Sequence, residues 1–106
     1  MASELPANVS IDQVFVIDAT YAPDAAETRK PVRAQHLARM ADLRDAGVVV
    51  EAGGYGDMSG SMLIVRAESA DAALEIARED VYMKSGVWVE LRVKPFGRVV
   101  RTRPSG

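Results

Sequence analysis

The sequence predicts an α+β fold, in which a four-stranded antiparallel sheet carries two helices on one face. Three observations favour this fold. Residues 14–17 form a β-branched run between polar residues, as in a buried strand. From Val32 onwards, apolar residues recur every three or four positions, as on one side of a helix. Residues 87–93 alternate between apolar and polar, as in a half-buried strand.

The first third of the chain predicts an arm, a strand, a loop and a helix. Residues 1–10 are polar and contain proline, so we expect a flexible N-terminal arm before a single domain at 11–106. Residues 18–31 include two prolines and predict a long loop, which could serve as a lid. Pro31 suits the first turn of the following helix, and Gly47 marks its end.

The remaining elements complete the order strand, helix, strand, strand, helix, strand. Strands are expected at about 48–52 and 61–66, joined by a glycine-rich connection. Ser69 is a good N-cap for a second helix that ends near Glu79, and residues 80–86 predict a loop. Pro95 is expected to end the last strand, leaving only a short edge strand at 99–100. This order is the ferredoxin-like βαββαβ arrangement.

Two helices cover only one face of such a sheet. We expect Phe15, Ile17 and Trp88 to make the other face partly apolar. A second copy of the chain could bury that face, which predicts a homodimer in the form of a dimeric α/β barrel.

Composition excludes several classes of function. The 106 residues carry a net charge of −2 with acids and bases interspersed, which argues against nucleic-acid binding. No apolar run is long enough to cross a membrane, and the first ten residues lack the features of a secretory signal, so we expect a cytoplasmic protein. The absence of cysteine excludes thiol chemistry, and a single histidine makes a zinc site unexpected.

The only histidine, His36, is the natural proton carrier if the protein does chemistry near neutral pH. Arg33 lies one turn before it, and Arg29 lies further upstream. Arginine can hold a carboxylate or an enolate with two parallel hydrogen bonds. The alternative is that both arginines are solvated charges on the helix surface.

Other side chains could complete a site. Asp80 could accept the second N–H of His36 and fix its tautomer, or it could simply cap the turn that follows. Tyr55, Tyr82 and Trp88 could line a pocket. Equally, Trp88 could belong to the sheet core and Tyr82 could be a packed loop residue.

Over about residues 14–96 the sequence resembles the YCII-related family. The matching motifs, in order, are Arg29, Val32-Arg33-x-x-His36-Leu37, Gly47, Gly53, Gly60-Ser61, Ser69, Ala72-Ala73, Asp80-x-Tyr82, Gly86-Val87 and Pro95-Phe96. The resemblance implies a dimeric α/β barrel in which His36 and Asp80 face each other in a cleft. Two positions depart from the family pattern, which usually has proline where this sequence has Gly54 and Val81. These changes affect the glycine-rich loop and the turn that would aim Asp80.

The resemblance also implies a chemistry, because one branch of the family includes a dehydrochlorinase that acts on a chlorinated hydroxymuconate. The sequence therefore predicts a cofactor-independent lyase or isomerase acting on a small unsaturated carbonyl or carboxylate compound, without metal. His36 would be the general base and acid, and Asp80 would orient it. The expected substrate-binding residues are Arg33, Arg29, Ser61 and Tyr82. Two alternatives stay open: a non-catalytic dimeric module that binds a small ligand or a partner, and an oxygen-using monooxygenase of the same barrel fold.

Overall fold

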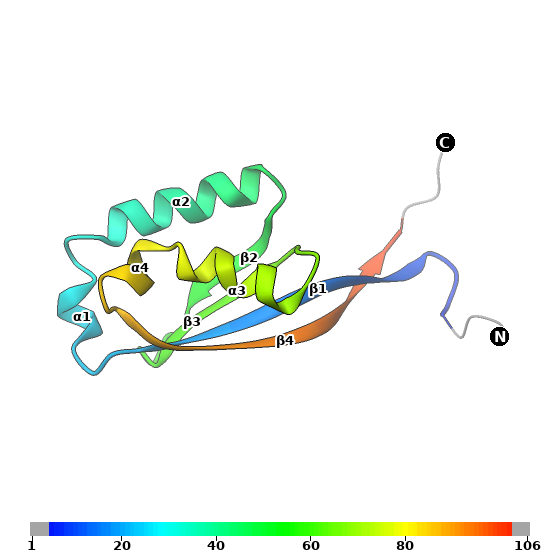
Figure 1. The fold of residues 1–106 in the computed structure, drawn as a ribbon. Helices are drawn as coiled ribbons and strands as arrows, with labels where there is room; N and C mark the ends of the chain where they lie inside the picture. The colour runs from blue at the N-terminus through cyan, green and yellow to red at the C-terminus, as the bar shows by residue number, and fades with distance from the viewer. Residues whose placement is uncertain (1–4, 103–106) are drawn as a thin grey trace.

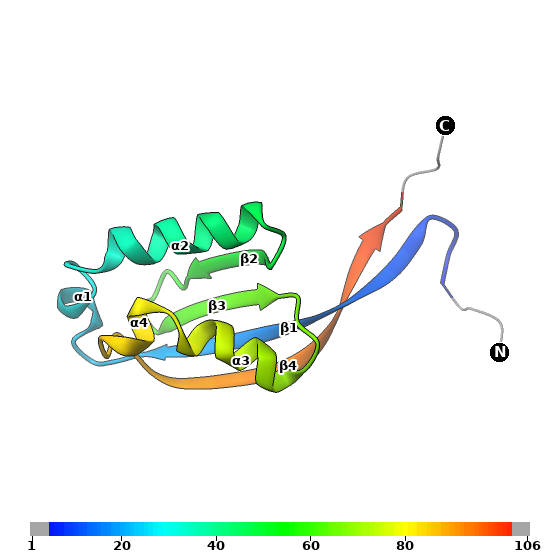
Figure 2. The same cartoon turned by 45° about the horizontal axis from the view of Figure 1, so that its top comes forward.

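The computed structural model describes residues 5–102 and has the strands and the two longer helices in the predicted order (Figure 1). The elements are β1 (Val9–Tyr21), α1 (Ala25–Thr28), α2 (Arg33–Asp45), β2 (Val49–Gly54), β3 (Gly60–Val65), α3 (Ala70–Arg78), α4 (Val81–Lys84) and β4 (Trp88–Arg101). The strands form one antiparallel sheet in the order β2-β3-β1-β4, and α2 and α3 cover the same face of it (Figures 1 and 2). The predicted α+β fold is confirmed. Among residues 5–102, no helix has the length and apolar character that spanning a membrane would require.

The first and last strands are longer than predicted. β1 pairs with β4 from Val9 to Tyr21, but with β3 only from Phe15 to Thr20. The part of this strand pair that β3 does not share projects beyond the helices as a two-stranded extension (Figures 1 and 2). Val9 and Ser10, which were expected in the flexible N-terminal arm, belong to β1. Residues 1–4 lie outside the part of the chain that the structure describes.

The prediction that Pro95 ends the last strand is wrong, because β4 continues through it to Arg101. The reason lies in the position of the strand. β4 is at the edge of the sheet and pairs only with β1, so a residue without an N–H can be accommodated on the open side.

Two predicted loops contain regular structure. β1 extends to Tyr21 and the single turn α1 follows, so residues 18–31 are not one long loop. Ala25 is buried in the core, and the backbone N–H of Ala22 donates to the carbonyl of Val87 at 2.8 Å. These contacts anchor the segment and argue against a lid. Residues 80–86 likewise contain the short helix α4.

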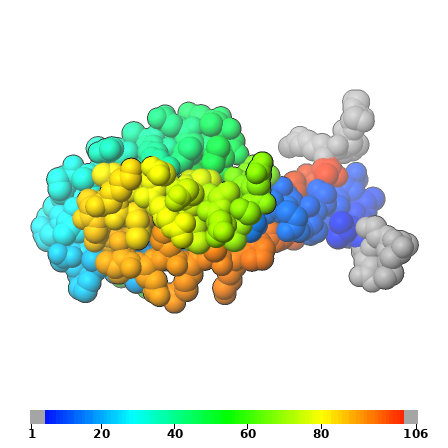
Figure 3. Space-filling model, in the orientation of Figure 1, coloured from blue at the N-terminus to red at the C-terminus, as the bar shows by residue number. Residues whose placement is uncertain are grey.

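The apolar core lies between the sheet and the helices, and side chains of α2 and of the α3–α4 segment meet over it (Figure 3). Ile17 and Trp88 are almost fully buried there, so the prediction that they belong to the open face is wrong. The register explains the difference, because Ile17 lies opposite Leu63 and Val93, and cross-strand partners point to the same face. Phe15 follows the same alternation and packs against this core.

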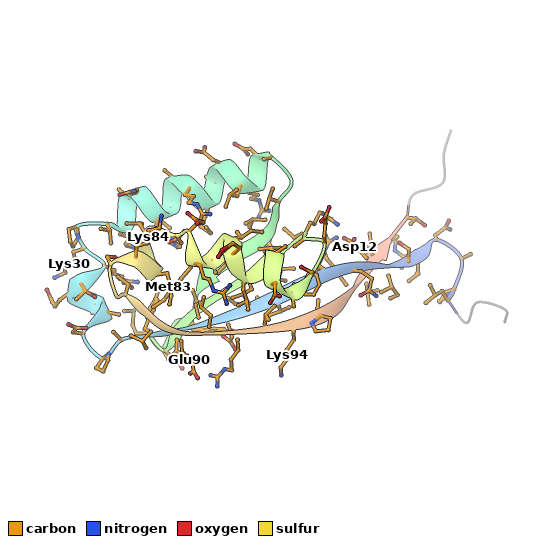
Figure 4. The ribbon with its side chains drawn as sticks, in the orientation of Figure 1. Asp12, Lys30, Met83, Lys84, Glu90 and Lys94 are labelled. Carbon is orange, nitrogen blue, oxygen red and sulfur yellow. The ribbon has the colours of Figure 1, made fainter. Side chains whose placement is uncertain are left out.

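The face away from the helices is mixed in character. Glu90 and Lys94 project from β4 on this side (Figure 4). Val16 lies opposite Lys94 and Ile64, so it shares their face, and both apolar side chains are partly exposed. This face therefore carries a small apolar centre with charged residues beside it.

Candidate active site

His36 and Asp80 meet beneath the helices, although 44 positions separate them in the chain. His36 lies in the first turn of α2, and Asp80 lies between α3 and α4. The imidazole Nδ1 is 2.7 Å from Asp80 Oδ1. The two residues are 7% and 0% exposed, so this is a buried pair and the expected contact is present.

Asp80 also caps α4, so both roles considered for it coexist. Its Oδ1 accepts a hydrogen bond from the backbone N–H of Tyr82 at 2.9 Å, and its backbone is extended, as is typical of an N-cap. Val81 occupies the first position of α4, where the family usually has proline. The turn forms without proline because the aspartate caps it.

Arg39 is a third member of the cluster that the sequence analysis missed. Its Nη1 donates to Asp80 Oδ2 at 2.9 Å, and its Nη2 donates to the carbonyl of Ile76 in α3 at 2.9 Å. Arg39 lies three positions after His36, and residues at that spacing share one side of a helix. That spacing was the available signal.

These contacts determine the ionisation of Asp80. Burial raises the pKa of this carboxyl, but hydrogen bonds from His36, from the backbone of Tyr82 and from Arg39 outweigh burial and hold the pKa below its usual value. An ionised carboxylate can only accept hydrogen bonds. Nδ1 of His36 must therefore carry a proton, which leaves Nε2 as the basic nitrogen of a neutral ring.

Aromatic rings fix the plane of the imidazole. The Tyr82 ring stacks on His36 with centroids 3.8 Å apart and planes 9° from parallel. Trp88 meets the His36 ring edge-on, with centroids 5.4 Å apart. His36 is therefore held in one orientation by packing as well as by Asp80.

A cavity of about 290 Å³ opens beside His36. It is lined by all four residues predicted to bind substrate, which are Arg29, Arg33, Ser61 and Tyr82. Tyr55 also lines the cavity. Trp88 does not line it and lies in the core, which was one of the two positions predicted for it. Tyr21 lines the cavity as well and was not predicted. Gly54, where the family usually has proline, forms part of the wall.

The cavity carries positive charge. Within the described part of the chain, neither Arg29 nor Arg33 has a carboxylate at ion-pair distance, although the adjacent Lys30 pairs with Glu27. Burial, with a smaller contribution from Tyr21, raises the pKa of Tyr82, and the charges of Arg29 and Arg33 offset this only in part. The Tyr82 phenol is therefore neutral at physiological pH. Two unpaired guanidinium groups favour an anionic ligand.

A metal centre finds no support in residues 5–102, where no three side chains of His, Cys, Asp or Glu are grouped to hold an ion. The polar groups of the cavity are instead an imidazole, two guanidinium groups and hydroxyls. This donor set suits proton transfer and the binding of oxyanions.

The fold and the site define a small ferredoxin-like protein with a buried histidine–aspartate pair facing a cationic cavity. Residues 14–97 match the family model described as the YCII-related domain, and the chain belongs to that family. It is 36% identical to Protein YciI of Escherichia coli over 96 residues, which cover 81% of this chain and 98% of that protein. An uncharacterized protein of Haemophilus influenzae is 34% identical over 95 residues, which cover 80% of this chain and 97% of that protein.

A solved structure of 5-chloro-2-hydroxyhydroquinone dehydrochlorinase from Burkholderia phenoliruptrix, in complex with 2,5-dihydroxybenzoquinone, is similar in fold. The TM-score is 0.64 at 28% identity, and the match covers 76% of this chain and 90% of that chain. The name of that enzyme gives its substrate as a chlorinated hydroxyhydroquinone rather than a hydroxymuconate.

Proposed function

We propose that this protein is a cofactor-independent lyase or isomerase that moves a proton on a small, anionic, unsaturated carbonyl or carboxylate compound. The observation that carries the proposal is the buried pair of His36 and Asp80, hydrogen-bonded at 2.7 Å, beside a cavity that holds two arginines with no carboxylate partner in residues 5–102. The pair leaves Nε2 of His36 to take a proton from a substrate, and the two arginines supply positive charge to stabilise an enolate.

The chemistry follows from the ionisation states. Nε2 of His36 takes a proton from a carbon next to a carbonyl, and the C–H electron pair forms the C=C bond of an enolate. Asp80 stabilises the imidazolium that results, and Arg33 and Arg29 stabilise the negative oxygen. The enolate then either regains the proton at another carbon, which is isomerisation, or expels a leaving group such as chloride, which is elimination.

The ligand of the similar dehydrochlorinase structure suggests the size of substrate. 2,5-Dihydroxybenzoquinone is a single planar ring with four oxygens. A cavity of about 290 Å³ lies at the small end of the range for ligand sites. A substrate of one ring, or an open chain of similar size, fits that volume.

We also propose that the protein is a homodimer that pairs through the open face of the sheet. The partly exposed Val16, Met62 and Ile64 on that face support this proposal. In analytical ultracentrifugation we expect the dimer mass for the wild type and the monomer mass for Ile64→Glu. A wild-type monomer at high protein concentration would contradict the proposal.

The central test replaces the base with a residue that cannot titrate. We expect the wild type to release chloride from 5-chloro-2-hydroxyhydroquinone, or to exchange carbon-bound protons of related unsaturated keto acids for deuterium, as followed by NMR. His36→Gln should lower that rate by about 10²–10⁴-fold while the protein stays folded. Arg44→Gln, on the exposed side of the same helix, is the matched control and should keep the wild-type rate.

A His36→Gln variant with wild-type activity would eliminate the mechanism. A wild-type protein that binds these compounds but catalyses neither reaction would favour the other function considered, a non-catalytic module that binds a small ligand.

A further inference from the structure

Tyr21 ends β1 at an irregular point of the sheet. The register between β1 and β4 shifts between Thr20 and Tyr21, and Tyr21 lies opposite Trp88 at the start of β4. Such bulges redirect side chains and are common beside functional sites. Here both aromatic residues face the helices, and the Tyr21 ring lies edge-on to Tyr82 with centroids 6.4 Å apart. Since Tyr82 stacks on His36, Tyr21 and His36 line neighbouring parts of one cavity.

Three side chains form a hydrogen-bonded chain, and two of them, Tyr21 and Ser61, line the cavity. The indole Nε1 of Trp88 donates to Ser61 Oγ at 3.2 Å. Ser61 Oγ in turn donates to Tyr21 Oη at 3.2 Å. All three residues are buried or nearly so.

Burial decides the direction of this chain, because Ser61 Oγ has two lone pairs and could also accept from Tyr21. An indole N–H can only donate, so Ser61 Oγ must accept from Trp88. Ser61 then has one proton, which it gives to Tyr21. The opposite direction, with Tyr21 donating to Ser61, would leave the hydroxyl proton of the more deeply buried Ser61 without a protein acceptor in the described part of the chain.

The phenolic proton of Tyr21 consequently has no acceptor among residues 5–102. The hydroxyl lies at the cavity wall beside Gly54, where an added Cβ would come within 3.2 Å of Tyr21 Oη. Glycine at this position therefore leaves the hydroxyl open to the cavity.

We propose that Tyr21 donates a hydrogen bond to an oxyanion of the ligand, and that Ser61 and Trp88 are positioning residues that fix the direction of its proton. The proposal rests on the proposed function, because the oxygen it assigns to Tyr21 is the one on which the enolate charge develops. It moves Ser61 from a substrate contact to a residue that acts through Tyr21. The ligand class is a small planar compound with an ionised oxygen conjugated to a carbonyl.

The test measures binding, without turnover. The probe is 2,5-dihydroxybenzoquinone, which carries ionised oxygens at neutral pH, and its Kd is measured by isothermal titration calorimetry. A hydrogen bond to a charged group contributes enough that Tyr21→Phe should weaken binding by about tenfold or more. Ser61→Ala should weaken it less, and the double variant should bind no more weakly than Tyr21→Phe alone, since both changes remove one interaction.

Ser85→Ala is the control outside the cavity. Ser85 is exposed and its hydroxyl donates to the carbonyl of Val81 at 2.6 Å, so its removal should change the Kd by less than about twofold. Emission from Trp88, the only tryptophan, reports on the fold of each variant. Should Tyr21→Phe fail to fold, Ser61→Ala decides: a severalfold loss of affinity supports the proposal, and wild-type affinity overturns it.

Three other results would overturn the proposal: unchanged binding by Tyr21→Phe, a greater loss in Ser61→Ala than in Tyr21→Phe, and no saturable binding by the wild type. The His36→Gln test is independent, because it measures a rate. Proton transfer by His36 can therefore survive the failure of this proposal, and binding by Tyr21 can survive the failure of proton transfer.

Discussion

Two carboxylates in this protein each accept hydrogen bonds from two side chains, and their surroundings differ. Asp80 is held by His36 and Arg39 and is fully buried. Asp12 is held by Arg66 at 2.7 Å and Arg98 at 3.1 Å. Its side chain is 24% exposed, on the part of β1 that runs into the projecting extension (Figure 4). Both carboxyls are ionised at neutral pH, but only one is removed from water.

The pKa values show the effect of this difference. For Asp12, the hydrogen bond from Arg66 is the largest influence, and it lowers the pKa of a group that water could also solvate. For Asp80, burial is the largest influence and raises the pKa, and several hydrogen bonds are required to reverse it. A buried cluster of this kind is therefore poor evidence of stabilisation and better evidence of a functional site.

The largest expected effect is the loss of stability on removal of Asp80, which should exceed the loss on removal of Asp12. Asp80→Ala leaves Nη1 of Arg39 and Nδ1 of His36 without their shared acceptor and removes the cap of α4. We expect the free energy of unfolding to fall by about 3–5 kcal/mol, measured by urea denaturation at pH 7 and fixed protein concentration. Asp12→Ala should cost much less, because water replaces the lost contacts. Equal losses would contradict the comparison.

How much of the fold could be predicted depended on whether the signal was local. Periodicity and the Ser69 cap predict the elements and their order, and Ser69 does accept from the backbone N–H of Ala72. The end of β4 could not be predicted from the local sequence. Pro95 would stop a strand that pairs on both sides, but β4 pairs on one side only. The faces of Ile17 and Trp88 also required the cross-strand register, which the sequence of a single strand does not contain.

For the site, the residues could be predicted better than their connections. Residue chemistry selected His36, and the family resemblance selected Asp80, for which composition alone favoured the role of a cap. The spacing of Arg39 to His36 places both residues on one side of the helix, which is the local signal for its part in the cluster. Tyr21 could not be found this way, because its place in the cavity depends on a bulge where β1 pairs with the distant start of β4.

A smaller loss of stability is expected when Arg39 is replaced, and measuring it tests whether Arg39 stabilises the buried cluster. Arg39→Met removes the hydrogen bonds to Asp80 Oδ2 and to the carbonyl of Ile76. We expect a loss of about 1–3 kcal/mol in the free energy of unfolding, because a buried anion keeps fewer donors. Arg39→Lys should recover only part of it, since an ammonium cannot reproduce the two-branched contact.

The control for Arg39 lies on the same helix. Arg44 pairs with Glu51 at 2.7 Å, but both side chains are more than half exposed. Arg44→Met should therefore change stability far less than Arg39→Met. A comparable loss in the two variants would show that burial of the partner does not matter.

The smallest expected effect is on stability at low pH, and its sign follows from the lowered pKa of Asp80. The folded-state pKa lies below the ordinary 3.8, so the unfolded chain binds the proton first as the pH falls. The contribution of this group to stability is thus fully present well above pH 3.8 and is lost as the pH falls through the folded pKa. Because burial raises the pKa of Asp80 while the hydrogen bonds lower it, we expect the contribution to stability to be modest.

Urea unfolding from pH 5 downwards should show a shallower loss of stability for Asp80→Asn than for the wild type. Identical slopes would mean that Asp80 has the same pKa in both states, and the buried carboxylate would then differ from Asp12 in location alone.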